Sequence, residues 1–108
     1  MPDLTPLSAR TLRRAEIYAL ATLYWPLEEV ENAVNVCYLE SGFRTHAHNQ
    51  NNEDSRGLWQ INVVSEAHPE LAAWNLFDPQ INAYFAAKIW RDSGWRAWYN
   101  SARSLGLI

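Results

Sequence analysis

Hydrophobic residues in the N-terminal part of the chain recur at helical spacing and predict two helices. The first is expected from Ser8, whose hydroxyl can cap a helix, to about Trp25. Its apolar stripe is expected to contain Leu12, Ala15, Ala19 and Leu23. Pro26 ends this helix or starts the next one, which should stop near Gly42, a natural left-handed cap. The second stripe contains Leu27, Val30, Val34, Cys37 and Tyr38.

The periodicity stops between residues 44 and 55, where Asn, Asp and His are frequent. Such a composition indicates turns or a short hairpin. We expect a short extended segment over 58–62 and a brief helix over 67–74, interrupted near Pro69. Asp78 as a cap and Pro79 at the first helical position predict a helix that continues to Gly94. A short final helix over 95–103 completes a mostly α (α+β) fold, with a small insert after the second helix.

The size and composition of the chain predict one small packed domain. Its 108 residues suit a single domain, and the balance of 48% hydrophobic and 19% charged residues excludes disorder through high charge. We therefore treat residues 1–108 as one domain. Cys37 is the only cysteine, so no disulfide can form within the chain and packing must supply the stability.

The charge and the hydropathy exclude several classes of partner. The formal net charge is −3, which argues against nucleic-acid binding because that requires a basic face. No apolar run approaches the roughly 18 residues that a membrane span requires. The first residues, beginning Met1-Pro2-Asp3, lack the basic and apolar segments of a secretory signal, so we expect any export to depend on other means.

Glu40 is the first candidate for chemistry, because it falls on the last turn of the second predicted helix. It follows an apolar helical face, Leu39 and Phe43 are apolar neighbours, and the negative end of the helix dipole disfavours its ionisation. A carboxyl group in such surroundings can remain protonated and act as a general acid. The simpler interpretation is an ordinary exposed glutamate at a helix end.

The aromatic content is high for a chain of this length, with six Trp and five Tyr. Most of these rings should pack in the core. Some could line a sugar-binding cleft, where flat rings stack on sugar faces beside polar groups.

Several fragments follow Glu40 in a characteristic order. They are Glu40-Ser41-Gly42-Phe43, then Ala47 with Asn49 and Asn51, then Gly57-Leu58-Trp59-Gln60-Ile61-Asn62. Further along come Asn82, Ala83, Ala86, Ala87, Lys88 and Ile89, then Gly94-Trp95-Arg96-Ala97-Trp98. Together they resemble the lysozyme and lytic transglycosylase superfamily over roughly residues 30–100. The resemblance implies a lysozyme-like fold, with helices around a cleft.

The resemblance also implies roles for individual residues. Glu40 matches the catalytic acid, Gln60 and Asn62 match polar residues of the cleft, and Asn49 and Asn51 match loop residues that orient the reacting sugar or a catalytic group. Amide side chains suit these roles because they donate and accept hydrogen bonds at once. The full set expected to bind substrate is Ser41, Asn49, Asn51, Ser55, Trp59, Gln60, Asn62, Trp98 and Tyr99. Core packing is an equally good interpretation of the three aromatic residues.

A second carboxylate usually acts as the nucleophile or as the base that activates water. Asp54 is our candidate, with Glu53 as a lesser alternative and ordinary loop capping as the simpler role. In animal-type lysozymes the corresponding aspartate lies two residues before the glycine of the Gln-Ile-Asn strand. That position is Ser55 in this chain, and a shorter loop could shift the register by one residue.

The resemblance implies a peptidoglycan muramidase that hydrolyses the β-1,4 bond between N-acetylmuramic acid and N-acetylglucosamine. One alternative is a lytic transglycosylase that forms anhydro products with Glu40 acting alone. Another is a lysozyme-like domain that binds glycan or serves as a structural part of a phage tail without cutting. An acidic enzyme gains little from electrostatic attraction to an anionic wall, so delivery as a module of a larger phage or cell-wall assembly is expected.

No metal or organic cofactor is expected, and the domain itself is expected to be monomeric. His46, His48 and His68 match no familiar zinc spacing and are interpreted as surface residues. Cys37 could in principle be a nucleophile, but its place on the apolar stripe indicates a core residue.

Overall fold

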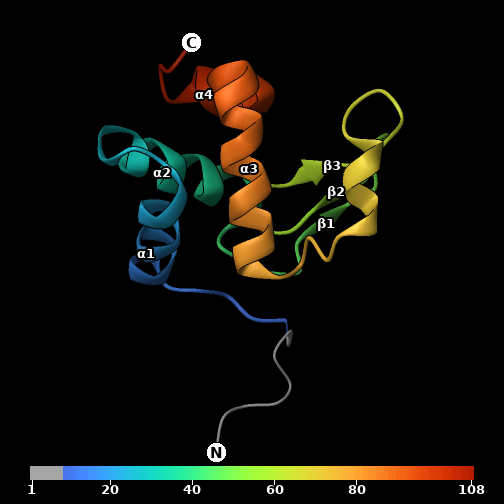
Figure 1. Cartoon of the computed structure of the whole chain (residues 1–108), viewed down its shortest axis with the longest axis horizontal. Coiled ribbons are helices and arrows are strands. Elements are labelled where there is room, and N and C mark those ends of the chain that lie inside the picture. Colours follow the sequence, from blue (N-terminus) through green and yellow to red (C-terminus); the bar gives the residue numbers. More distant parts are fainter. Residues whose placement is uncertain (1–8) are drawn as a thin grey trace, which may run out of the picture.

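The computed structural model describes residues 9–108, which form helices and a small three-stranded antiparallel sheet. The elements in chain order are α1 (Arg14–Tyr24), η1 (Leu27–Glu29), α2 (Val30–Ser41), β1 (His48–Asn49), β2 (Ser55–Arg56), β3 (Ile61–Asn62), η2 (Pro69–Ala73), α3 (Pro79–Ser93), η3 (Gly94–Trp98) and α4 (Tyr99–Ser104). Figure 1 shows α3 at the centre, with α1 and α2 on one side and the sheet on the other. The expected mostly α (α+β) class is confirmed.

The first helix begins later than the sequence pattern predicts. Residues 10–12 are extended and lie beside residues 43–45, where the Leu12 N–H donates to the Phe43 carbonyl at 2.9 Å. The helix then starts at Arg14 and buries Ile17 and Ala21, whereas Leu23 is exposed. The predicted stripe was therefore wrong, because Leu12 reaches the core from an extended segment and does not set the helical face. The predicted cap Ser8 lies outside the described residues.

The end of the second helix follows its sequence signals. Gly42 takes a left-handed conformation with φ of +62°, and its N–H donates to the Tyr38 carbonyl at 2.8 Å. A side chain other than glycine would be strained in this conformation. The buried face is made by Val30, Ala33, Val34, Val36 and Cys37, whereas Leu27 and Tyr38 from the predicted stripe are exposed.

The polar segment after α2 forms the short hairpin that the sequence indicated. Strands β1 and β2 pair His48 with Arg56 and Asn49 with Ser55, and β3 pairs with β2 on the other edge. The extended segment expected over 58–62 is shorter, because only Ile61 and Asn62 pair as a strand and the residues before them form turns.

The remaining helices begin and end near their predicted positions. The Asp78 carboxylate caps α3 by accepting from the Gln80 and Ile81 N–H groups at 2.8 and 3.1 Å. Pro69 begins the short helix η2 and does not interrupt one. The expected final helix is divided into η3 and α4. Within residues 9–108, no helix has the length and apolar character that crossing a membrane requires.

Asn82 of α3 joins the helix to the loop before β3. Its side chain is fully buried and accepts from the Trp59 N–H at 2.9 Å. Its amide nitrogen donates to the carbonyls of Arg56 and Leu76, both at 2.9 Å. Because buried polar groups without partners are costly, this side chain is the support on which the loop depends.

Gly57 provides a test of this close packing. Its φ is +78°, and a Cβ atom there would overlap the Leu76 carbonyl and the Asn82 amide. Gly106 has a similar φ of +74° but open space around it. We expect Gly106→Ala to cost about 1–2 kcal/mol of unfolding free energy and Gly57→Ala about 4 kcal/mol or more. Urea unfolding followed by circular dichroism measures both, and equal losses would contradict the importance of this contact.

Candidate active site

Glu40 lies on the last turn of α2 and is half-buried. The Ser101 hydroxyl of α4 donates to its Oε2 at 2.5 Å. Burial is the main cause that raises the pKa of Glu40 above its ordinary value, and the negative charge of Glu53 adds to this effect. The Ser101 hydrogen bond acts in the opposite direction, and the net shift is upward. The carboxyl group therefore has the environment of a proton donor.

Asp54 is held differently, by two cationic or polar partners at the hairpin. Arg56 donates to both carboxylate oxygens through Nε and Nη2, each at 2.9 Å. The Nε2 atom of His48 lies 2.6 Å from Oδ1. These contacts, led by the Arg56 hydrogen bonds, lower the pKa of Asp54 to about 2. Asp54 is thus ionised at neutral pH and joins β1 to β2 through its side chain.

Gln60 and Asn62 line a hollow of about 440 Å³, together with Trp98 and His68. The amide nitrogen of Gln60 donates to the carbonyls of Ala47 and Gly57, both at 2.9 Å. The amide oxygen of Asn62 accepts from the Asp54 and Val64 N–H groups. The other half of each amide is the part that could contact a sugar hydroxyl. Glu40 is not among the residues that line this hollow.

Three residues that the sequence placed in the substrate site lie in the interior instead. Trp59 has no exposed surface, and its indole N–H donates to the Ala33 carbonyl. The Ser41 hydroxyl closes the end of α2 by donating to the Cys37 carbonyl and accepting from the Phe43 N–H. Ser55 is 3% exposed within the sheet. Burial removes all three from contact with a ligand in this conformation.

The other expected ligand contacts remain predictions. Asn49 and Asn51 are exposed on the hairpin loop, where the Asn49 amide oxygen accepts from the Asn51 N–H at 3.0 Å. Tyr99 is exposed on the first turn of α4. Trp98 lines the hollow with little exposed area, and its N–H donates to the Trp59 carbonyl at 2.7 Å.

Ser101 is the contact of Glu40 that sequence reasoning missed. It lies 61 positions from Glu40, and no local signal in the sequence connects the two residues. Only the packing of α4 against α2 brings the two side chains together.

Neither a metal nor a thiol chemistry is supported by the described side chains. Within residues 9–108, no three His, Cys, Asp or Glu side chains converge in a way that could hold a metal ion. Cys37 is fully buried, and burial raises the pKa of its thiol well above the ordinary value. A buried neutral thiol is a poor nucleophile.

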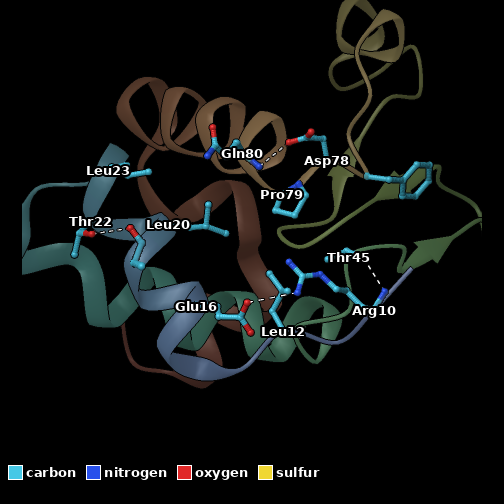
Figure 2. Close-up of a pocket in the computed structure, with 12 residues that line it drawn as sticks. Arg10, Leu12, Glu16, Leu20, Thr22, Leu23, Thr45, Asp78, Pro79 and Gln80 are labelled. Atoms are coloured by element: carbon cyan, nitrogen blue, oxygen red, sulfur yellow. Dashed lines mark hydrogen bonds and ion pairs between the residues drawn. The ribbon is translucent and has the colours of Figure 1, made fainter. Parts of the chain in front are cut away.

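A larger hollow of the described structure lies away from these residues. It holds about 730 Å³ between α1, the preceding extended segment and the start of α3. Figure 2 shows Arg10 and Glu16 paired there, at 3.6 Å, and Asp78 occupied by its capping bonds. None of the residues that the sequence predicted for the site lines it. Chemistry, not volume, therefore identifies the candidate active site.

The contacts of Asp54 with Arg56 and His48 predict that the stability of the folded chain depends on pH. The pKa of Asp54 is lower in the folded chain than its ordinary 3.8, so its contribution is complete above about pH 4 and is lost as the pH falls toward 2. Asp54→Asn should lower the unfolding free energy by about 1–2 kcal/mol at pH 7. In this variant the unfolding free energy should also decrease less as the pH is lowered. Urea unfolding between pH 2 and 7 measures this. Asp92→Asn, at an exposed position of α3, is the control and should leave the decline unchanged.

Comparison with known proteins agrees with this arrangement. The family model described as "Lysozyme like domain" matches residues 26–100, which is more than two thirds of the chain. The matched part contains Glu40, the hairpin, the strand with Gln60 and Asn62, and α3. A search of the curated proteins finds no match. The chain belongs to the lysozyme-like domain family and is thereby related to the lysozymes and transglycosylases that act on peptidoglycan.

Proposed function

We propose that the chain is a muramidase that hydrolyses the β-1,4 bond between N-acetylmuramic acid and N-acetylglucosamine, with Glu40 as the general acid. The observation that supports this most is the half-buried Glu40 carboxyl, whose pKa is raised by its surroundings. A general acid must keep its proton near the working pH, and burial is the usual cause. The site of action is the cell wall, reached by secretion or as part of a virion.

The second carboxylate is a separate proposal. Asp54 is the residue that the sequence favoured, yet both of its oxygens are engaged by Arg56 and one also by His48. Glu53 is the carboxylate whose charge acts on Glu40. We therefore assign the second catalytic carboxylate to Glu53, and to Asp54 the role of holding the loop that carries it.

The chemistry follows from these two groups. Glu40 donates its proton to the glycosidic oxygen as the bond to the anomeric carbon breaks. The negative charge of Glu53 stabilises the positive charge that develops on the sugar, or accepts a proton from the attacking water. Gln60 and Asn62 hold sugar hydroxyls beside the reacting bond. Water then forms the new bond to the anomeric carbon, and the proton that it releases returns to the ionised Glu40, directly or by way of Glu53, which restores the acid for the next cycle.

Glu40→Gln tests the proton donor. The amide keeps the shape of the side chain but has no acidic proton, so release of reducing sugars from purified cell walls should fall at least about 100-fold. Glu31→Gln, at an exposed position of the same helix, should retain full activity. Undiminished release by the Glu40→Gln protein, with normal circular dichroism, would refute the proposed role.

Glu53→Gln and Asp54→Asn separate the two carboxylates. We expect Glu53→Gln to lose about 10- to 100-fold of the turnover with little change in stability. Asp54→Asn should lose activity mainly through a less stable hairpin, and low temperature should restore part of it. Turnover at several temperatures, beside thermal unfolding curves, measures both. Full activity of the Glu53→Gln protein would return the assignment to Asp54 or to Glu40 alone.

The second candidate function is that of a lytic transglycosylase. It is favoured by the contacts of His48 and Arg56 with Asp54, which engage both of its carboxylate oxygens. Glu40 would then act first as acid and next as base, and the sugar's own hydroxyl would close the ring. Mass spectrometry of the released fragments decides between reducing ends and anhydro ends. Binding to cell walls without release of any fragment would instead indicate a glycan-binding or structural domain of a phage tail.

A further inference from the structure

The closest polar partner of Glu40 is a serine on another helix. Ser101 lies on α4, is only 7% exposed, and donates from Oγ to Oε2 of Glu40 at 2.5 Å. A hydrogen bond of this length between a hydroxyl and a carboxylate is short and charge-assisted. The contact is therefore well placed to fix the orientation of the Glu40 carboxyl group.

The position of Ser101 is set by the same packing that orders the hollow. Trp98, immediately before α4, donates from its indole N–H to the Trp59 carbonyl at 2.7 Å. This buried bond ties the start of α4 to the segment that leads into β3. Ser101 therefore keeps a defined place relative to both Glu40 and the strand that carries Asn62.

A hydroxyl group suits a carboxyl that changes its protonation state. It donates to the carboxylate when Glu40 is ionised, and it can accept from the acid proton when Glu40 is protonated. The same pair of atoms can thus stay hydrogen-bonded in both states with only a rotation of the hydroxyl. Such a partner suits a group that gives up and regains a proton in each cycle.

The negative charge of Glu53 acts on Glu40 in the sense opposite to Ser101. Glu53, from the hairpin loop, disfavours the ionised form of Glu40 through its negative charge. Cys37, one turn earlier on α2, is a buried thiol whose own pKa is raised. Among the described residues, Ser101 is the side chain whose hydrogen bond lowers the pKa of Glu40, against burial and Glu53.

We propose that Ser101 is a positioning residue that holds the Glu40 carboxyl in its reactive orientation and follows it through both protonation states. The inference rests on the proposed function of Glu40 as general acid, but its central measurement does not require catalysis. It also predicts the direction of a shift: without the hydroxyl, ionised Glu40 loses its donor, and the group keeps its proton to higher pH.

The test compares Ser101→Ala and Ser101→Thr with Ser104→Ala, a matched control at an exposed position of the same helix. In the pH profile of Ser101→Ala, the alkaline limb, where kcat/KM decreases as the pH rises, should move to higher pH. The kcat of this variant should fall about tenfold. Ser101→Thr keeps the hydroxyl and should restore the position of the limb. Ser104→Ala should match the wild type in both. If Ser101→Ala does not fold, Ser101→Cys, of similar size and a weaker donor, should show the same direction of change.

Titration of the Glu40 side-chain carboxyl by carbon-13 NMR separates this inference from the proposed function. An upward shift in Ser101→Ala relative to the wild type and to Ser104→Ala supports the positioning role, even in a chain that cleaves nothing. An unchanged titration of Glu40, or an unchanged alkaline limb in an active protein, overturns it. Undiminished activity of Glu40→Gln would refute the catalytic assignment alone.

Discussion

The side chain of Asn82 joins α3 to the turn between β2 and β3 and to the segment just before the helix. From the buried face of α3 it bonds the backbone at Trp59, Arg56 and Leu76. The contacts with the Trp59 N–H and the Leu76 carbonyl are buried, and a buried polar group left without a partner costs about 1–3 kcal/mol. An apolar residue of the same size could fill the space but could not satisfy these groups. The turn that leads into β3 therefore depends on one amide.

This support reaches the candidate site through the two strands on either side of that turn. β2 ends at Arg56, whose guanidinium holds Asp54, and β3 carries Asn62, whose amide oxygen accepts from the Asp54 N–H. The loop that presents Glu53 is thus anchored at its C-terminal end by both backbone and side-chain contacts. The positions of the charged side chains at the site therefore depend on how the core packs.

The carboxyl group of Asp54 in the hairpin and that of Glu40 at the end of α2 have different surroundings. Asp54 is stabilised as an anion by Arg56, whereas burial and the charge of Glu53 disfavour the anion at Glu40. Separating the pKa values of carboxyl groups in this way allows an acid and an anion to coexist at one pH. The Ser101 hydroxyl bonds the Glu40 carboxyl group and acts against the upward shift of its pKa. In the proposed reaction Glu40 is the acid and Glu53 is the anion, and the contacts of Asp54 hold the loop that carries Glu53.

Local signals in the sequence determined the ends of several elements and the family. The Asp78-Pro79 cap and Gly42 act within one helical turn, so their effect can be predicted without knowledge of the fold. The fragments from Glu40 to Asn62 were sufficient to indicate the lysozyme-like family, which the family model confirms. The first apolar stripe failed because Leu12 pairs with a segment 31 residues away, and no helical period contains that information.

Only the tertiary structure decided which side chains meet. It buried Ser41 and Ser55, which the family resemblance had placed at the substrate, and it decided for Trp59 between the substrate and the core. It also engaged Asp54 with Arg56 and His48. It also brought Ser101 to Glu40 from 61 positions away. Caps and turns are short-range effects of the backbone, whereas the surroundings of a carboxyl group depend on the helices and loops that pack around it. The sequence could therefore single out Glu40 as the candidate acid, and the fold had to supply its partners.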